Sequence, residues 1–370
     1  DVELGDINLS ATYSGALSAP EQGEGRLTLA RLRLNDPVQP RRFMPIAVAG
    51  SGRMDAGRAE GDVRLRALDA QLLRVTGDHD FTAATGAVHF DTDRLSFGPG
   101  GVDLPLLVPA LKQTLRSVGG GGSAAGRLAW SDHGLVSSGR ALLDDVSVEL
   151  SAAKISGVNG EATLASLIPP TTNGYQRLRI DSVVAGIELT GGVIDYALGA
   201  DGLARISRAD WKWGGGRLGV YDAVAALDGS PLRAPVEVRG VDLSAVLGAL
   251  NVEGLSGDGR LTGVFPVALS DGRLQVKDGR LSSEADGVLR YSGPQEAVAL
   301  GVSAEQSELL FGALSNFQYK SIVMSLNGAV DDALTLKLTL DGANPDFLDG
   351  YPFKINLTTR ADVSDVFKSD

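Results

Sequence analysis

Three histidines and the carboxylates beside two of them are the side chains best suited to metal binding: His79, His89, His133, Asp80, Asp91 and Asp93. No two of the histidines have the spacing of a metal-ligand pair. Aspartate is also common in turns, and that role accounts for these carboxylates without a metal. We therefore expect no metal site and no cofactor.

Two glycine runs could in principle form phosphate-binding loops, but neither has the required context. Gly119–Gly122 is not followed by the Lys-Ser or Lys-Thr pair of such a loop, and Gly214–Gly216 precedes a strand pattern rather than a helix. A Gly-x-Ser-x-Gly nucleophile elbow is also absent from the sequence. We expect the chain not to be an enzyme.

A carbohydrate-active enzyme stays an alternative, because the paired carboxylates of glycoside hydrolases are recognised by their separation and not by sequence. Three tryptophans could form a sugar-binding platform or part of a core: Trp130, Trp211 and Trp213. Two close carboxylates beside Trp211 or Trp213 in a polar cleft would favour this alternative.

The elements that must position these side chains are short strands. Residues 257–281 alternate apolar and polar side chains, and their three Asp-Gly pairs predict turns that separate antiparallel strands. Similar period-two runs occur at residues 25–30, 61–65 and 87–90. This pattern fills most of the chain and predicts strands with one buried face.

Three segments depart from the strand pattern and predict short helices. They are residues 103–117, 242–250 and 304–315, where leucines recur at helical spacing. Residues 119–123 have the composition of a flexible linker, either natural or engineered.

The composition excludes several classes of function. The chain has 370 residues, a formal net charge of −12, 43% hydrophobic residues, 48 glycines and no cysteine. Acidic and basic residues are interspersed, so we expect no nucleic-acid partner. No apolar run approaches the roughly 20 residues of a membrane-spanning helix. Since the chain begins at Asp1, we interpret it as a segment of a longer protein.

The predicted fold is mostly β: one elongated, curled antiparallel sheet, forming a hydrophobic groove, with a few short helices, over residues 1–370. A long sheet with so much aliphatic surface must curl, pack against a second sheet or hold an apolar ligand. The residues expected to line the groove alternate with polar residues in the last third of the chain: Phe265, Val267, Leu269, Leu274, Val276, Ile322, Met324, Leu326, Leu334, Leu336, Leu338, Leu340, Phe353, Ile355 and Leu357. The alternative is that these side chains fill a closed, dry core.

Several motifs occur in a characteristic order: His79-Asp80-Phe81, Gly126-Arg127-Leu128-Ala129-Trp130, Val158-Asn159-Gly160, Gly192-Val193-Ile194-Asp195-Tyr196, Ala209-Asp210-Trp211, residues 257–266, Asp278-Gly279-Arg280-Leu281, Gly287-Val288-Leu289-Arg290-Tyr291 and Phe317-Gln318-Tyr319-Lys320-Ser321. In this order they resemble the C-terminal region of the YdbH-type proteins, members of the AsmA-like superfamily that includes TamB. The resemblance covers residues 79–367 and is strongest over residues 251–367.

The resemblance implies a bridge-like protein that conducts glycerophospholipids along an apolar groove from the inner to the outer membrane of a Gram-negative envelope. It also implies a periplasmic location, an inner-membrane anchor that lies outside this sequence, and an outer-membrane or periplasmic protein partner at the C-terminal end. The expected ligands are phospholipid acyl chains. The alternative function is a structural or adhesive β-rich module.

Overall fold

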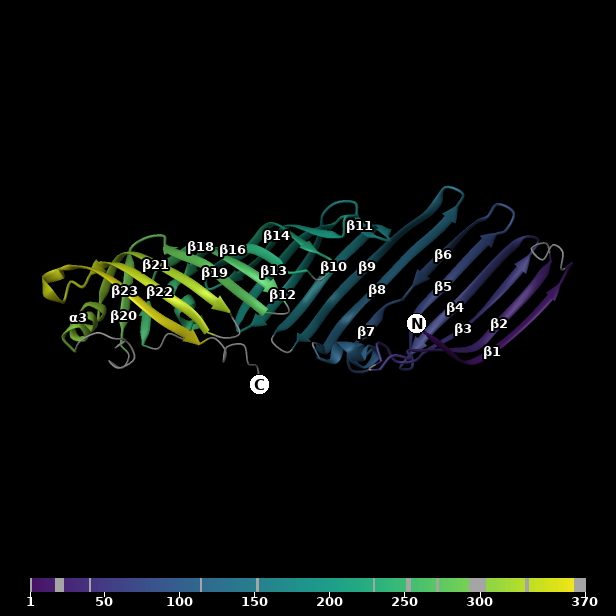
Figure 1. Cartoon of the computed structure of the whole chain (residues 1–370), viewed down its shortest axis with the longest axis horizontal. Helices are drawn as coiled ribbons and strands as arrows, with labels where there is room; N and C mark the ends of the chain where they lie inside the picture. The colour runs from purple at the N-terminus through teal and green to yellow at the C-terminus, as the bar shows by residue number, and fades with distance from the viewer. Residues whose placement is uncertain are drawn as a thin grey trace. The chain divides into compact units, whose positions relative to one another are not determined.

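The computed structural model describes residues 2–16, 23–39, 41–113, 115–150, 153–228, 230–250, 254–270, 273–292, 304–329 and 333–362. Within these residues, 23 strands form one sheet with antiparallel pairing, accompanied by three short α-helices (Figure 1). The predicted mostly-β antiparallel class with a few short helices is therefore confirmed.

The chain divides into two compact units. Unit 1 comprises Asp1–Asp181 and Tyr196–Gly202, and unit 2 comprises Ser182–Asp195 and Leu203–Asp370. Two strands contribute residues to both units: β12 (Gln176–Ala185) and β13 (Ile187–Leu198).

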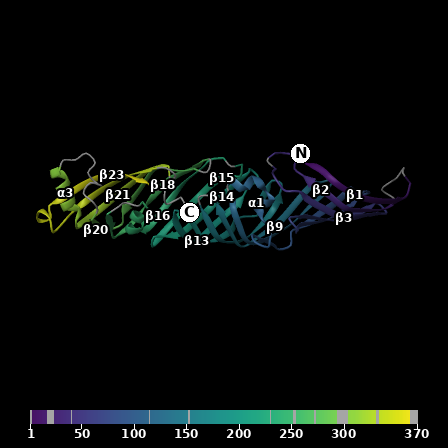
Figure 2. The same cartoon turned by 90° about the horizontal axis from the view of Figure 1, so that it is seen from below.

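Unit 1 contains the following elements: β1 (Glu3–Ser14), β2 (Glu24–Asn35), β3 (Ile46–Asp55), β4 (Arg58–Ala67), β5 (Ala70–Asp80), β6 (Thr85–Asp91), β7 (Leu95–Phe97), α1 (Leu104–Leu107), the 3₁₀ turn η2 (Pro109–Gln113), β8 (Leu115–Ser131), β9 (Gly134–Leu150), β10 (Lys154–Leu167) and β11 (Pro170–Thr172). Consecutive strands from β1 to β6 pair as hairpins, as the neighbouring β1, β2 and β3 show in Figure 2. Both β6 and β7 pair with β8, which pairs in turn with β9, and β9 pairs with β10.

The predicted flexible linker at residues 119–123 is wrong, because these residues lie inside β8 and pair with β7 and β9. Gly119, Gly120 and Gly121 form a β-bulge in the pairing of β8 with β9. Gly120 has φ of +89°, and a Cβ on it would lie 2.1 Å from the carbonyl oxygen of Asp145. Only a residue without a side chain allows the two backbones to approach so closely.

The predicted helix at residues 103–117 is much shorter than expected. It consists of one α-helical turn, α1, and the separate 3₁₀ turn η2, and β8 already begins at Leu115. The start was predicted correctly: the Asp103 carboxylate accepts a hydrogen bond from the backbone N–H of Leu106 at 2.8 Å, which caps the turn. Val108 then leaves helical geometry before Pro109, and the residue before a proline disfavours the α conformation.

Unit 2 contains the remaining elements: β14 (Leu203–Trp213), β15 (Gly216–Ala226), β16 (Leu232–Asp242), α2 (Leu243–Ala249), β17 (Leu255–Gly257), β18 (Arg260–Ser270), β19 (Arg273–Ser283), β20 (Gly287–Tyr291), α3 (Ala304–Leu314), β21 (Phe317–Ala329), β22 (Ala333–Ala343), the 3₁₀ turn η4 (Leu348–Gly350) and β23 (Pro352–Asp362). The strands pair in the order β14, β15, β16, β18, β19, β21, β22 and β23. The helices α2 and α3 correspond to the two later helices predicted from sequence.

The hydrophobic core cluster lies within unit 2. It joins the apolar face of these strands to side chains of α2, including Leu243, Val246 and Leu247. Among the Asp-Gly pairs, Asp258-Gly259 separates β17 from β18, as predicted, and residues 271–272 lie outside the described residues. Asp278-Gly279 does not form the predicted turn. Asp278 has φ of +54° at a bulge inside β19.

Candidate functional site

Unit 1 has one continuous apolar sheet face. Residues opposite one another on paired antiparallel strands share a face, and one such row runs from β2 to β6 through Leu29, Gly50, Val63, Val75 and Phe90. Neighbouring rows add further aliphatic residues to the same face: Leu9, Leu27, Val48, Leu65, Leu73, Val88 and Leu128. We call this surface the unit 1 apolar face.

The opposite face of the same strands is charged. The Arg74 guanidinium of β5 donates to the Asp62 carboxylate of β4, with a shortest distance of 2.7 Å. This hydrogen bond lowers the pKa of Asp62, so the carboxylate is ionised at neutral pH. Exposed ion pairs of this kind stabilise a fold by only about 0–1 kcal/mol each. The charged side chains keep this face hydrated. The sheet is therefore amphipathic, with one apolar face and one charged face.

Much of the unit 1 apolar face is open. Val48 is buried, with 8% of its surface exposed, but Val63, Val75 and Leu128 are half-buried and Leu27 is 42% exposed. The hydrophobic core cluster, by contrast, is formed by residues of unit 2. A contiguous exposed apolar surface of this kind is typical of a site that binds a ligand, a partner or lipid.

A row of glycines crosses the unit 1 apolar face. Gly52 of β3 lies opposite Gly61 of β4, which lies opposite Gly77 of β5. Gly52 also lines a hollow of about 280 Å³. Six of the ten residues that line this hollow belong to the unit 1 apolar face: Ala11, Gly25, Leu27, Gly52, Met54 and Ala59. The missing side chains leave a depression in an otherwise aliphatic surface.

The strand registers place the groove residues predicted from sequence on one face of unit 2. Leu281 lies opposite Met324, Met324 opposite Leu338, and Leu338 opposite Leu357. The other predicted residues occupy alternate positions of the same strands: Phe265, Val267, Leu269, Leu274, Val276, Ile322, Leu326, Leu334, Leu336, Leu340, Phe353 and Ile355. Of Leu269, only the backbone is among the described parts.

Burial divides these predicted residues into two groups. The first has 0–8% of its surface exposed and belongs to the core cluster: Ile322, Met324, Leu326, Leu334, Leu336, Leu338, Leu340 and Ile355. The second is half-buried or exposed: Phe265, Val267, Leu274, Val276, Phe353 and Leu357. Only the second group offers surface to a ligand in this structure. Contact of either group with lipid stays a prediction.

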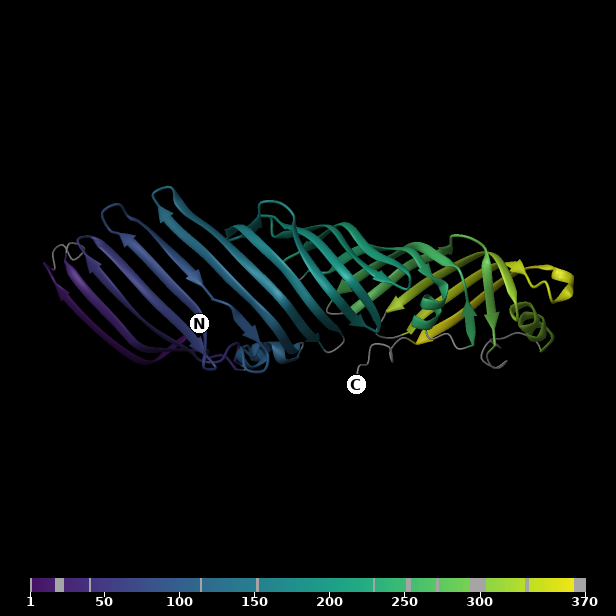
Figure 3. The ribbon, with the colours of Figure 1, turned by 180° about the vertical axis from the view of Figure 1, so that it is seen from behind.

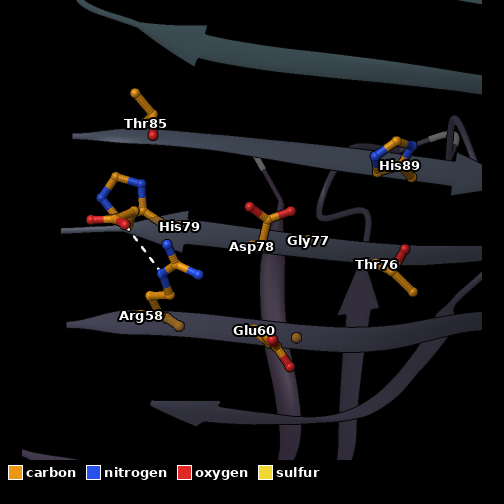
Figure 4. A pocket seen from close by; sticks show the side chains of 11 residues that line it. Arg58, Glu60, Thr76, Gly77, Asp78, His79, Thr85 and His89 are labelled. Atoms are coloured by element: carbon orange, nitrogen blue, oxygen red, sulfur yellow. Dashed lines mark hydrogen bonds and ion pairs between the residues drawn. The ribbon is translucent and has the colours of Figure 1, made fainter. Parts of the chain in front are cut away.

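A polar pocket of about 560 Å³ lies over β4, β5 and β6 (Figure 4). Arg58 and Asp80 form an ion pair there at 3.2 Å, while Glu60 lies opposite Asp78 across two strands. Among the described residues, no group of three or more His, Asp or Glu side chains has the geometry to hold a metal ion. His89, Glu60 and Asp78 form part of the polar lining of this pocket.

Comparison with known families indicates the class of ligand for the apolar surfaces. Residues 2–369 match the YdbH-like family, described as intermembrane phospholipid transport protein YdbH. The chain belongs to the YdbH-like family. Membership gives it a role in phospholipid transport, and the match extends beyond the 79–367 range of the sequence resemblance. No curated protein and no solved structure matched the chain.

For a YdbH-like chain, the half-open unit 1 apolar face is the candidate lipid surface. None of the described helices is long and apolar enough to cross a membrane. The sequence already showed the period-two runs at residues 25–30, 61–65 and 87–90, which form parts of β2, β4 and β6. It did not show that these runs align into one face, because that depends on the register between strands.

Trp211 and Trp213 share one face of β14, and Asp210 lies on the other. On β14, Trp211 lies opposite Leu218 and Trp213 opposite Gly216, whereas Asp210, which directly precedes Trp211, points to the other face. The Asp210 carboxylate is bonded by the Arg217 guanidinium at 3.0 Å. Asp210 therefore does not supply the feature that would favour a carbohydrate-active enzyme.

Proposed function

We propose that the unit 1 apolar face holds the acyl chains of glycerophospholipids as they pass between the inner and outer membranes of a Gram-negative envelope. The observation that supports this is the alignment of apolar residues, most of them half-buried or exposed, on one face of the strands from β2 to β6 and of β8. Membership in a phospholipid transport family supplies the ligand.

The energetic reason is the high cost of moving an acyl chain through water. Each methylene contributes about 0.8 kcal/mol, so a chain of about 14 methylenes would cost on the order of 11 kcal/mol to expose. Contact with an aliphatic sheet face recovers part of this free energy, while the charged opposite face keeps the protein hydrated.

The dimensions of the unit 1 sheet suit a path across the strands. Six strand spacings separate β2 from β9 through β3, β4, β5, β6 and β8. At about 4.8 Å each, they span roughly 29 Å. An acyl chain would lie over several strands at once, with the glycines of the row beneath it.

Unit 2 has accessible apolar residues of its own that we include in the proposal. Phe265, Val267, Leu274 and Val276 of β18 and β19, with Phe353 and Leu357 of β23, have surface available for acyl contact. The fully buried leucines of β22 support these strands from within the core.

The bridge-like mechanism places the parent protein in the periplasm, with an inner-membrane anchor and an outer-membrane or periplasmic partner at the C-terminal end. These parts of the proposal come from the sequence resemblance. The family's role in intermembrane phospholipid transport is consistent with them.

The test compares two adjacent substitutions on β6 by native mass spectrometry and lipid extraction. Val88 belongs to the unit 1 apolar face, whereas His89 is exposed on the charged face opposite Arg127. V88D should remove co-purified phospholipid from a folded protein, and H89D, which adds the same charge beside a cation, should retain it. A folded wild-type protein that neither carries nor takes up phospholipid would contradict the proposal and favour a structural β-module.

A further inference from the structure

Two segments of unit 1 meet at one edge of the sheet. The loop of residues 36–45, described at residues 36–39 and 41–45, joins β2 to β3, and the α1–η2 segment lies between β7 and β8. The backbone N–H of Met44 donates to the Leu107 carbonyl at 2.7 Å, which connects the loop to the helical segment. Figure 3 shows the helical segment beside the ends of the neighbouring strands.

The loop is held in place by a buried carboxylate. The side chain of Asp36 has 0% of its surface exposed and accepts a hydrogen bond from the Arg42 guanidinium at 2.8 Å. It also accepts hydrogen bonds from the backbone N–H groups of Val38 and Arg42. Arg41 lies in the chain between Val38 and Arg42, whose backbone N–H groups both bond to Asp36. These bonds hold the backbone around Arg41, while its side chain is exposed.

Exposed apolar and cationic side chains occur together on these two segments. Val38, Leu106 and Leu111 are 44%, 40% and 38% exposed, and Arg41 and Lys112 are exposed on the same two segments. Among the described residues, neither of these two cations forms an ion pair. We call these five residues the basic rim.

The basic rim adjoins the unit 1 apolar face. Leu34 of β2 lies opposite Ile46 of β3, and these residues flank the loop of residues 36–45. Leu32 and Val48, the next pair along the same face, continue it inward. A lipid whose acyl chains lie on this face can therefore have its polar end at the loop.

The opposite edge of the sheet carries acidic residues at the strand ends. Asp55 is the last residue of β3, Asp80 is the last residue of β5, and Asp132 lies between β8 and β9. Arg58 at this edge is engaged by Asp80 at 3.2 Å. The two cations of the basic rim attract an anion locally, although the whole chain has a net charge of −12.

We propose that the basic rim binds the headgroup phosphate of glycerophospholipids whose acyl chains lie on the unit 1 apolar face. This inference rests on the proposed function and adds the orientation of the bound lipid, with its phosphate at the basic rim. Arg41 and Lys112 donate to the phosphate oxygens, and Val38, Leu106 and Leu111 contact the first carbons of the acyl chains. Cationic residues flanked by apolar ones match the boundary between headgroup and acyl chain in this way.

The test measures two ligands with the same acyl chains, dioctanoylphosphatidylglycerol and uncharged dioctanoylglycerol, by calorimetry on the full chain. The variant R41E/K112E should raise the Kd for the phosphatidylglycerol by roughly 30-fold, since each of the two cations near a lipid phosphate contributes about 1 kcal/mol. Its Kd for dioctanoylglycerol should not change. The matched control R26E/R127E alters the net charge equally, at exposed positions on the charged face, and should leave both Kd values near those of wild type.

The outcomes distinguish a failure of the proposed function from a failure of the basic rim alone. A wild-type protein that binds neither ligand overturns the proposed function and this inference with it. Binding of both ligands without an effect of R41E/K112E, or with an equal loss in R26E/R127E, overturns the basic rim alone. If R41E/K112E fails to fold, R41Q/K112Q provides the same comparison without charge reversal.

Discussion

Gly61 of β4 lies directly opposite Gly77 of β5 on the unit 1 apolar face. A Cβ on Gly61 would approach no atom more closely than 3.8 Å, so the backbone does not require glycine there. Glycine inside a strand is unfavourable by about 0.5–1 kcal/mol relative to alanine. The absence of a side chain therefore calls for a reason other than folding, and an unobstructed path for an acyl chain provides one.

G61L should fold with stability equal to or above that of wild type and should carry less phospholipid. The leucine side chain would project into the glycine row, where an acyl chain is proposed to lie. Urea unfolding gives the stability, and lipid extraction with mass spectrometry gives the load. G61A is the control, since a single methyl group fills little of the depression. Undiminished lipid in folded G61L would show that the row is not part of the path.

L336D should unfold unit 2 instead of emptying a lipid site. Leu336 has 0% of its surface exposed and lies opposite Leu326 in the core. An unpaired carboxylate is strongly destabilising there. The milder L336A should lower the free energy of unfolding by about 2–5 kcal/mol. Circular dichroism and urea unfolding measure both effects.

The control for Leu336 is Leu274, which is on the same predicted lining but 37% exposed. L274A should cost less than about 1 kcal/mol, because surface changes have small effects on stability. A folded L336D protein that has lost bound lipid would show that Leu336 lines an accessible groove and would contradict its assignment to the core.

The sequence was sufficient to predict strands, because apolar alternation is local. It also placed the predicted lining residues on alternate positions that the structure brings to one face. It could not show that Leu336 is enclosed while Leu274 is exposed, since burial depends on how α2 and distant strands pack. The glycines at 119–122 were misinterpreted for a similar reason: their composition is that of a linker, and only pairing with β7 and β9 reveals the bulge.

The loop of residues 36–45 should lose stability in acid. The hydrogen bond from the Arg42 guanidinium holds the pKa of Asp36 well below that of an ordinary aspartate. A carboxyl group with a lowered pKa in the folded state stabilises that state above its unfolded pKa and loses this contribution as the pH falls further. The protection factors of the Val38 and Arg42 amides, which are exchange rates relative to the intrinsic rate at the same pH, should therefore fall below about pH 4 in wild type.

D36N is the matched variant for this loop. It removes the charge that Arg42 binds, so the amides of Val38 and Arg42 should exchange faster than in wild type at pH 7. The additional loss of protection in acid should disappear, because asparagine does not titrate. If D36N and wild type respond identically between pH 7 and pH 3, the Asp36 carboxylate does not hold the loop.

Tyr319 should hold the start of β18 in the unit 2 core. Its side chain is buried, with 1% of the residue exposed, and its hydroxyl donates to the Asp258 carbonyl at 2.6 Å. Y319F should lower the free energy of unfolding by about 1 kcal/mol, because the carbonyl loses its donor. Burial also raises the pKa of Tyr319. Wild-type stability should consequently fall as the pH rises above about 10, where the unfolded tyrosine ionises first. Y319F should show less of this alkaline loss in urea titrations at pH 8 and pH 11, and an equal loss in both proteins would exclude Tyr319 as its source.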